Sequence, residues 1–448
     1  MHLHFIAIGG SAMHNLALAL HQKGEIITGS DDTIFEPSKS RLENAGLLPE
    51  KLGWFPEKIT SKIDAVILGM HAREDNPELQ KARELGLKIY SYPEFLFEAS
   101  KNKTRVVIGG SHGKTSITAM ILHVLHYHQK EVDFMVGAQL EGFETMVHLT
   151  DKNDFMLLEG DEYLSSALDK RPKFHLYHPN IALLSGIAWD HINVFPTFEN
   201  YVEQFRIFVD SIVPGGILVY NEEDPVLREI AENASKPTRK HGYRKPNYHI
   251  ENGTSFLETP EGPMPLEIFG SHNMSNLAGA KWICQHMGVD EEDFYEAVSS
   301  FKGASKRLEK IAETSTCCIF KDFAHSPSKV LATTNSVKEQ FANRKLIACL
   351  ELHTFSSLNA TFLKEYRNSL DAADEAAVFY SPEAVKIKKL EPISKESIYT
   401  DFGRNDLHVF TDPEKFQQYL KNEDFENTVL LLMSSGNYGG LDIEKIIG

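Results

Sequence analysis

The stretch "VVIGGSHGKTS", Val106–Ser116, decides the fold of this chain. Its apolar β-branched residues predict a buried strand, its glycines a tight turn, and Lys114 the start of a helix. A helix that starts after such a turn can hold phosphates on its backbone N–H groups. The common P-loop, Gly-x-x-x-x-Gly-Lys-Thr/Ser, needs a glycine at position 108, where this chain has Ile108. The sequence therefore predicts a phosphate loop with a more compact spacing.

The role predicted for each loop residue follows from its chemistry. Lys114 would direct a positive charge at the β- and γ-phosphates, and the Thr115 hydroxyl would bind Mg²⁺. The alternative is an ordinary glycine turn with a solvated lysine, but strand, glycines, Lys-Thr pair and helix together favour the phosphate loop. We expect nucleotide contacts from Gly110, Ser111, His112, Gly113, Lys114, Thr115 and Ser116.

Strands that alternate with helices continue on both sides of the loop, which is typical of a parallel, doubly wound α/β fold. Polar breaks interrupt this pattern at "SKNKT" and near "SFKGASKR". The central part would carry the phosphate loop on a mostly parallel sheet, and the outer parts would be Rossmann-like. The sequence thus predicts three domains in series, at residues 1–102, 103–303 and 304–448.

The composition narrows the class of protein. The chain has a net charge of −17 and so lacks the positive electrostatic field by which nucleic-acid-binding proteins attract phosphates. No nucleic-acid partner is therefore expected. The chain begins without a leader pattern, and no apolar run approaches the length of a membrane span. We therefore expect a cytoplasmic protein with no membrane partner. No CxxC pair occurs, which predicts buried free thiols in a reducing compartment, at Cys284, Cys317, Cys318 and Cys349.

Acidic residues stand at the ends of two further predicted strands, where open α/β sheets bind ligands. Glu159, Asp161 and Glu162 belong to "LLEGDEY", and Asp190 and His191 follow "IALLSGI". A carboxylate and an imidazole from neighbouring strand ends could hold a divalent ion. The alternative is a set of surface acids beside a hydrogen-bonded histidine.

Two more groups of polar residues are candidates for nucleotide contacts. The amides at the helix start in "GSHNMSN" could read an adenine edge, or they could simply cap the helix. In "KRLEK" and "KDFAHSPSK", an arginine could neutralise a phosphate, an aspartate could bind a ribose or a metal, and a histidine could orient either. The alternatives there are a solvated arginine and a turn before Pro327. The candidates are His272, Asn273, Asn276, Arg307, Asp322 and His325.

Taken together, these motifs resemble the Mur ligase family of ATP-dependent, amide-forming enzymes over essentially the whole chain. "GGSHGKTS" is similar to the family's "GTHGKT" loop, and "EGDEY", "DH", "HNMSN", "RLE" and "DFAHSP" follow in the family's order. "FIAIGGSAM" resembles the family's UDP-binding turn, with Ala7 and Ala12 in place of its outer glycines. The resemblance implies that the first domain binds a UDP-sugar through Gly9, Gly10, Ser11, Ala12, Met13, Ser30, Asp31 and His71.

The chemistry that the resemblance implies is amide formation through an acyl phosphate. A carboxylate of the UDP-sugar attacks the γ-phosphate of ATP, and an amine then displaces phosphate. ATP and two Mg²⁺ ions are implied, one ion near Thr115 and one between Glu159 and His191. Lys114, Glu159 and His191 would be the catalytic residues, and the last domain would bind the amine.

Two members of the family with this kind of first domain use UDP-N-acetylmuramate and differ in the amine. One adds L-alanine, and the other adds the murein tripeptide L-alanyl-γ-D-glutamyl-meso-diaminopimelate in peptidoglycan recycling. The connection "EYLSSALDKRPKFHLYHPN" and the tail "LLLMSSGNYGGL" are similar to those of the second. The resemblance thus implies the tripeptide as acceptor, with addition of L-alanine as the alternative. The implied peptide contacts are Lys170, Arg171 and Lys173.

The chain departs from the family pattern at several positions. Gly186 stands for a usual asparagine, Lys321 stands for an acid, and no arginine follows the strand near His353. Together with Ala7 and Ala12, these departures motivate a further alternative, a nucleotide-binding protein without ligase turnover. A P-loop ATPase that drives motion would not explain the UDP-type first domain.

Overall fold

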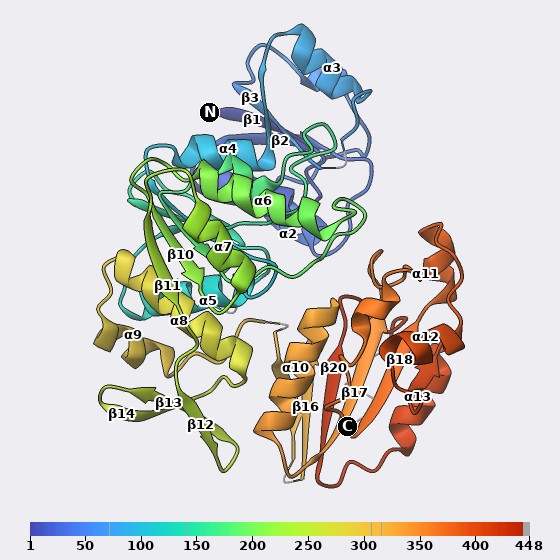
Figure 1. Ribbon diagram of the computed structural model, residues 1–448. Coiled ribbons are helices and arrows are strands. Elements are labelled where there is room, and N and C mark those ends of the chain that lie inside the picture. Colours follow the sequence, from blue (N-terminus) through green and yellow to red (C-terminus); the bar gives the residue numbers. More distant parts are fainter. Residues whose placement is uncertain (71, 141, 306, 315, 442–448) are drawn as a thin grey trace. The chain divides into compact units, whose positions relative to one another are not determined.

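The computed structural model describes residues 1–70, 72–140, 142–305, 307–314 and 316–441, and its chain forms two compact units. Parallel sheets with helices between their strands occur in both units (Figure 1), so the prediction of an α/β fold is confirmed. The domain boundaries after residues 102 and 303 remain a prediction. Unit 1 contains Met1–Ile187, Val202–Tyr243 and Gly279–Glu291, and unit 2 contains Ala188–Tyr201, Arg244–Ala278 and the chain from Glu292 onward.

The first sheet of unit 1 has four parallel strands in the order β2-β1-β3-β4. Its central strands are short apolar runs that are almost wholly buried. The strands are β1 (His2–Ile6), β2 (Ile26–Ser30), β3 (Ala65–Leu68) and β4 (Lys88–Ser91). The helices are α1 (Ser11–Gln22), α2 (Ser38–Asn44), α3 (Pro77–Glu84) and α4 (Tyr92–Ser100). The turn between β1 and α1 therefore lies at the carboxyl edge of this sheet.

The second sheet of unit 1 has the order β11-β10-β9-β5-β8-β6-β7, and only β7 runs antiparallel to its neighbour. The strands are β5 (Thr104–Gly109), β6 (Asp133–Met135), β7 (Val147–His148), β8 (Phe155–Glu159), β9 (Ile181–Leu184), β10 (Ile217–Asn221) and β11 (Arg239–Tyr243). Of the helices in this part of the chain, α5 (Lys114–Tyr127) and α7 (Pro225–Asn233) belong to unit 1, and α9 (Glu291–Val298) belongs to unit 2 from Glu292 onward. The unit boundaries fall within α6 (Phe198–Ser211) and α8 (Ser271–His286). Because β5 lies between the parallel strands β8 and β9, the phosphate loop and Glu159 share one edge of the sheet.

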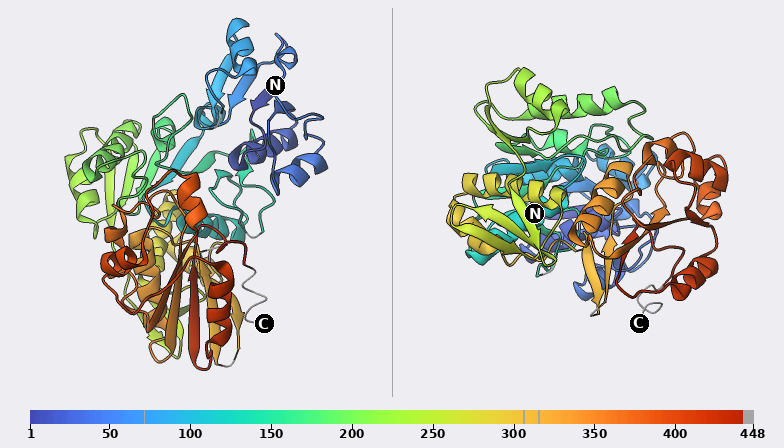
Figure 2. Two further views of the ribbon diagram at one scale, coloured as in Figure 1. Left: turned by 90° about the vertical axis from the view of Figure 1, so that its right-hand side faces the viewer. Right: turned by 60° about the horizontal axis from the view of Figure 1, so that its bottom comes forward.

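The large sheet of unit 2 has the order β15-β16-β20-β17-β18-β19, parallel except for β15 (Figure 2). One of its faces packs on α10, α11 and α12, and the other packs on α13. The strands are β15 (Glu309–Glu313), β16 (Cys317–Asp322), β17 (Lys345–Leu352), β18 (Glu375–Tyr380), β19 (His408–Phe410) and β20 (Thr428–Met433). The helices are α10 (Pro327–Gln340), α11 (Pro382–Ile387), α12 (Lys395–Phe402) and α13 (Pro413–Asn422).

A small antiparallel sheet in unit 2 was not predicted. It consists of β12 (Tyr248–Glu251), β13 (Thr254–Thr259) and β14 (Gly262–Leu266). Asn252 and Gly253 join the first two strands with φ of 50° and 78°. Positive φ at both central residues is the mark of a type I′ hairpin turn, and Asn-Gly is its preferred sequence.

All four cysteines are buried and free, as predicted. No helix in the described part of the chain is both long enough and apolar enough to span a membrane.

Candidate active site

The phosphate loop connects β5 to α5 through a turn that depends on glycine. Gly110 and Gly113 have φ of 130° and 77°, a region that favours glycine. A Cβ at Gly110 would stand 2.1 Å from the Ser185 hydroxyl oxygen, so only glycine fits. The Ser111 N–H donates to the Gly186 carbonyl at 2.9 Å. The end of β9 therefore fixes the shape of the loop.

Lys114 is the first residue of α5, and its ammonium points back to the loop. It donates to the Gly110 carbonyl and to Glu162 Oε2, the latter at 2.6 Å. Burial would lower the pKa of Lys114, but Glu162 and Asp161 raise the pKa above its usual value. Lys114 thus remains a cation at the point where a phosphate would arrive.

Thr115 and Glu159 place two oxygens side by side at the edge of the sheet. The Thr115 hydroxyl donates to Glu159 Oε1 at 2.8 Å, and the Gly137 N–H donates to Glu159 Oε2 at 2.8 Å. A Cβ at Gly137 would lie 2.8 Å from the Glu159 carboxylate, so a larger residue there would displace it. Hydroxyl and carboxylate oxygens are ligands that suit Mg²⁺. This pair therefore fits the metal that the phosphate loop implies.

Residues 161–174 form a hairpin whose base adjoins the phosphate loop. Backbone hydrogen bonds from Lys173 to Tyr163 and from Ser165 to Arg171 hold the two arms together, both at 2.9 Å. Lys173 pairs with Asp161 at 2.5 Å, next to the Glu162–Lys114 pair. Two ion pairs thus lie where the hairpin meets the loop.

The three predicted peptide-binding residues differ in their surroundings. Lys170 is exposed at the hairpin tip, but Arg171 pairs with Asp169 at 2.6 Å and with Glu94 at 3.6 Å. Lys173 is engaged by Asp161. The positive charge that the sequence suggested is therefore largely compensated within the hairpin and by Glu94.

The predicted UDP-sugar residues lie around the turn between β1 and α1. The Gly9 N–H donates to Asp31 Oδ2 at 2.7 Å, and a Cβ at Gly9 would stand 2.8 Å from the Ile34 side chain. Burial raises the pKa of Asp31, against the effect of the Gly9 N–H. The Ala7 N–H donates to the Ser30 carbonyl at 2.9 Å, and Ala7 has φ of 67°. An alanine therefore holds a left-handed conformation that suits the family's glycine.

The remaining residues of this group occupy the start of α1. Gly10 precedes the helix, Ser11 and Ala12 are exposed, and Met13 is buried. His71, predicted to contact the UDP-sugar, lies outside the described residues.

Asp190 and His191 belong to unit 2, in a segment that packs against the C-terminal core through Trp189 and Ile192. Asp190 Oδ1 accepts the His191 N–H at 2.7 Å, and Asp190 Oδ2 lies 3.6 Å from Lys329 Nζ. Burial would raise the pKa of Asp190, but Lys329 and the imidazole of His191 help to lower the pKa to about 2. Asp190 is therefore a buried carboxylate with a nearby cation.

His325 follows β16 and faces the same ion pair. Its Nδ1 contacts the Phe323 carbonyl at 2.8 Å, and its own carbonyl accepts a hydrogen bond from the Tyr366 hydroxyl. Burial and then Lys329 lower the pKa of His325 to about 4, although Asp190 acts in the opposite direction. His325 is therefore neutral at physiological pH.

The start of α8 carries the predicted adenine-reading group. Asn273 donates to the Phe269 carbonyl at 2.9 Å, and Asn276 donates to Asn273 Oδ1 at 3.5 Å. His272 Nδ1 lies 3.1 Å from the Ser336 hydroxyl. Neither of these side-chain hydrogen bonds caps the helix. In an N-cap bond the side chain would accept a helix N–H, whereas Asn273 donates to a carbonyl.

Asp322 is the last residue of β16, and Arg307 lies just before the neighbouring strand β15. Asp322 is buried and accepts a 2.6 Å hydrogen bond from Thr333 in α10. The Arg307 guanidinium lies 4.7 Å from the centre of the Phe323 ring. Phe323, between Asp322 and Ala324, thus provides a platform for the arginine.

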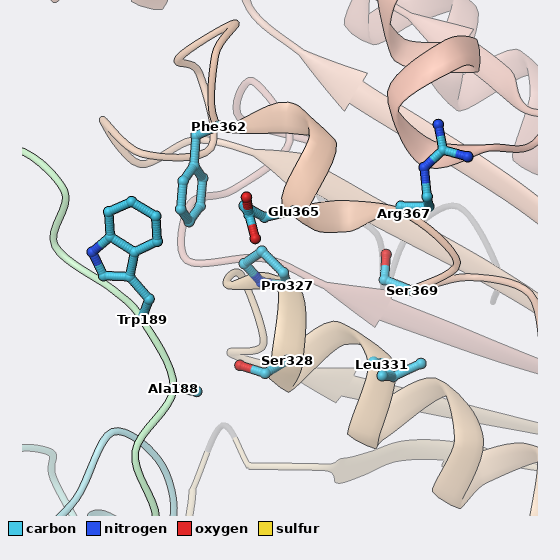
Figure 3. A pocket seen from close by; sticks show the side chains of 9 residues that line it. All are labelled: Ala188, Trp189, Pro327, Ser328, Leu331, Phe362, Glu365, Arg367 and Ser369. Carbon is cyan, nitrogen blue, oxygen red and sulfur yellow. The ribbon is translucent and has the colours of Figure 1, made fainter. Parts of the chain in front are cut away.

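A pocket of about 250 Å³ in unit 2 lies beside the segment that carries His191. Trp189 and Phe362 form its aromatic wall, with ring centres 6.0 Å apart and an edge-to-face angle of 82°. Figure 3 shows Arg367 directed away from Glu365, and its guanidinium donates to the Thr400 carbonyl at 3.2 Å. The lining residues are Ala188, Trp189, Pro327, Ser328, Leu331, Phe362, Glu365, Arg367 and Ser369.

The sequence-predicted residues thus fall in both units. Unit 1 contains the phosphate loop, Glu159 and the predicted UDP-sugar residues, and unit 2 contains His191, the amides of α8, Arg307, Asp322 and His325. No cluster of three or more His, Cys, Asp or Glu side chains suited to a metal occurs in the described ranges. Sequence reasoning missed Ser185 and Lys329. For Lys329 the sequence held one signal: it is a lysine in the first turn of a helix, where acidic residues are favoured, so a nearby anion could have been expected.

Comparisons with known proteins agree with this architecture. Residues 2–104 match the Mur ligase family catalytic domain, and residues 108–284 match the Mur ligase middle domain. A UDP-N-acetylmuramate–L-alanine ligase of Lactococcus lactis subsp. cremoris is 30% identical over 387 residues, covering 83% of this chain and 81% of that protein. A UDP-N-acetylmuramate–L-alanine ligase of Desulfitobacterium hafniense is 28% identical over 459 residues, covering 98% of this chain and 97% of that protein.

Solved structures share the fold. A murein peptide ligase from Psychrobacter arcticus has a TM-score of 0.67 at 22% identity, and a UDP-N-acetylmuramate–alanine ligase from Thermotoga maritima has 0.72 at 20%. Each comparison covers 100% of this chain and 98% of the other. A UDP-N-acetylmuramate:L-alanyl-γ-D-glutamyl-meso-diaminopimelate ligase from Neisseria meningitides is 26% identical, with a TM-score of 0.59 over 67% of this chain and 98% of that one. This chain therefore belongs to the Mur ligase family and is an ATP-dependent ligase.

Proposed function

We propose that this ligase joins the lactyl carboxylate of UDP-N-acetylmuramate to the amine of L-alanyl-γ-D-glutamyl-meso-diaminopimelate. ATP activates the carboxylate as an acyl phosphate, the amine attacks the acyl carbon, and phosphate leaves. ADP and phosphate are the by-products. Three domains, at residues 1–102, 103–303 and 304–448, would bind the UDP-sugar, ATP and the acceptor.

The hairpin at residues 161–174 is the observation that carries the choice of acceptor. Its base meets the phosphate loop through Lys173–Asp161 and Lys114–Glu162, and its tip exposes Lys170. An acceptor that reaches the activated carboxylate would therefore pass close to this hairpin. A diaminopimelate-containing tripeptide carries carboxylates that L-alanine lacks. Lys170 is suited to bind them, and so is Arg171 if it exchanges Asp169 and Glu94 for a carboxylate of the peptide.

The ATP site follows from the fit between residues and ligands. Backbone N–H groups of the loop would bind phosphates, and Lys114 would exchange Glu162 for a phosphate oxygen. Mg²⁺ would supply charge neutralisation between two anionic reactants. Two ions are proposed, one near Thr115 and one held by Glu159 and His191. Arg307 would add a second cation for the phosphates, and Asp322, His325 and the amides of α8 would contact the nucleoside.

The UDP-sugar site would use the turn between β1 and α1. Gly9 and Gly10 let the backbone approach the diphosphate closely, at the start of a helix. Asp31, already bonded to the Gly9 N–H, lies where it could accept a hydrogen bond from the nucleoside. Ser11, Ala12, Met13, Ser30 and His71 complete the proposed contacts.

Addition of L-alanine is the second candidate, and specific observations favour it. The two curated relatives above are named as L-alanine ligases. Asp169 and Asp161 already engage Arg171 and Lys173, and no arginine follows β17 near His353. These features reduce the positive charge offered to a peptide.

An acceptor panel tests the assignment. We expect kcat/KM for the tripeptide to exceed that for the dipeptide L-alanyl-γ-D-glutamate and for L-alanine, all measured on one preparation with UDP-N-acetylmuramate, ATP and Mg²⁺. Lys170→Ala should lower the tripeptide value and leave the L-alanine value unchanged. A preference for L-alanine would move the assignment to the second candidate. ATP binding without turnover of any acceptor would favour the alternative without ligase activity.

A further inference from the structure

Lys329 occupies an electrostatically unfavourable position in its own helix. It lies in the first turn of α10, which contains no acidic residue. A helix N-terminus carries partial positive charge, so a lysine there is disfavoured. The helix alone therefore does not account for this side chain, whereas the nearby Asp190 does.

The two carboxylate oxygens of Asp190 face different partners. Oδ1 accepts the backbone N–H of His191 at 2.7 Å, and Oδ2 lies 3.6 Å from Lys329 Nζ. The Asp190 side chain is only 7% exposed. A buried carboxylate is stable only when it is compensated by charge and hydrogen bonds, and Lys329 supplies the charge.

The bond from Asp190 acts on a backbone that needs support. His191 has φ of 57°, a left-handed conformation that is unfavourable for a residue with a Cβ. Its N–H is bonded to Asp190, and its carbonyl accepts the N–H groups of Val194 and Phe195 at 2.8 and 2.9 Å. Asp190 is therefore one of the groups that hold the His191 backbone in this conformation.

We propose that Lys329 is a positioning residue of the ligase reaction. Its ammonium neutralises Asp190 and holds that carboxylate in place, and Asp190 in turn fixes the backbone of His191. The same contact fastens the segment that carries His191 to α10, next to the packing of Trp189 and Ile192 on the C-terminal core. This inference rests on the proposed function, which assigns His191 to Mg²⁺.

A matched pair of variants tests the proposal. Lys329→Met removes the charge and keeps the apolar stem. Lys338→Met is the control, because Lys338 lies on the same helix, pairs with Asp374 at 2.6 Å and is 29% exposed, against 27% for Lys329. The first measurement is the His191 imidazole signal by NMR in metal-free protein, assigned with His191→Gln. The second is the affinity for Mn²⁺, which substitutes for Mg²⁺, in the presence of ADP.

We expect Lys329→Met to displace the His191 signal and to weaken Mn²⁺ binding at least tenfold. Lys329→Arg and Lys338→Met should keep both near wild type. An unchanged His191 signal in Lys329→Met would overturn the proposal. If His191→Gln binds Mn²⁺ like wild type, the metal role assigned to His191 fails, and the NMR comparison still decides whether Lys329 positions it.

A double variant covers a failure of Lys329→Met to fold. Lys329→Met with Asp190→Asn removes both charges and leaves no buried ion unpaired. We expect this protein to fold with a displaced His191 signal, since the amide at position 190 loses the charge-assisted bond. A wild-type His191 signal in the double variant would contradict the proposal.

Discussion

The Thr115 hydroxyl donates a 2.8 Å hydrogen bond to the carboxylate of Glu159, although 44 residues separate them along the chain. The bond joins the first turn of α5 to the end of β8. The second carboxylate oxygen is held by the Gly137 N–H, so both oxygens of Glu159 have fixed positions. Two oxygens in fixed positions at the phosphate loop suit the proposed binding of Mg²⁺ by Thr115 and Glu159.

Glu159→Gln should raise the Mg²⁺ concentration needed for half-maximal activity by at least about 10-fold, because loss of even an outer-shell partner of a metal ligand costs about 10- to 100-fold in metal affinity. The amide keeps the shape and can still accept from Gly137, but it lacks the negative charge. Activity titrated against Mg²⁺ measures the effect. Glu98→Gln, which changes an exposed acid on α4, is the control. The same Mg²⁺ midpoint in Glu159→Gln and wild type would remove Glu159 from the metal site.

Lys114→Ala should abolish ligation in practice. Loss of one preorganised charge or donor at a transition state costs about 2.7–4 kcal/mol, which is about 10²- to 10³-fold in kcat. Phosphate release in the presence of all substrates measures it. A rate near that of wild type would contradict the phosphate-loop role.

The Lys114–Glu162 pair also predicts a stability effect. The Glu162 side chain is only 2% exposed, so removal of Lys114 leaves a buried carboxylate without its ammonium partner. We expect Lys114→Met to lower the melting temperature and the added change Glu162→Gln to recover part of the loss. Thermal unfolding by circular dichroism decides this; no recovery would mean that the pair is not coupled.

Local sequence signals predicted the fold well because each depends on neighbouring residues. The apolar run before Gly109 and the glycines after it specify β5 and the phosphate loop without any distant contact. The hairpin turn at Asn252-Gly253 carried an equally local signal, and its strands were missed because they are short and only half-buried.

The electrostatics of the site could not be predicted in the same way. Lys329 and Asp190 are far apart in sequence, and only the packing of unit 2 brings them within 3.6 Å. Arg171 also lies 3.6 Å from Glu94 on α4, a partner that only the fold brings near. Charge in a sequence is local, whereas its compensation depends on the fold.

Ala7→Gly should leave the protein as stable or make it more stable by up to about 1.6 kcal/mol. Relief of the left-handed strain at φ of 67° stabilises the folded protein by about 1–2 kcal/mol. The greater conformational freedom of glycine in the unfolded chain offsets about 0.4–1 kcal/mol of this gain. Ala12→Gly, in the first turn of α1, should instead lower stability by up to about 1 kcal/mol. Chemical denaturation of both variants tests the contrast. Equal losses would show that Ala7 is not strained.

His325 predicts a pH-dependent stability with a defined sign. Burial and Lys329 lower the pKa of His325 to about 4 in the folded protein, against 6.5 for the free side chain. Between these values the unfolded chain binds a proton that the folded chain does not, so stability falls as pH drops from 6.5 towards 4. The full shift corresponds to about 3 kcal/mol, and partial exposure of the ring reduces the expected effect to about 1–3. His325→Asn keeps a donor for the Phe323 carbonyl and does not titrate. The free energy of unfolding of this variant should therefore fall less steeply than that of wild type as the pH is lowered from 7 to 4. Parallel curves for the two proteins would show that His325 is not the group responsible for the pH dependence.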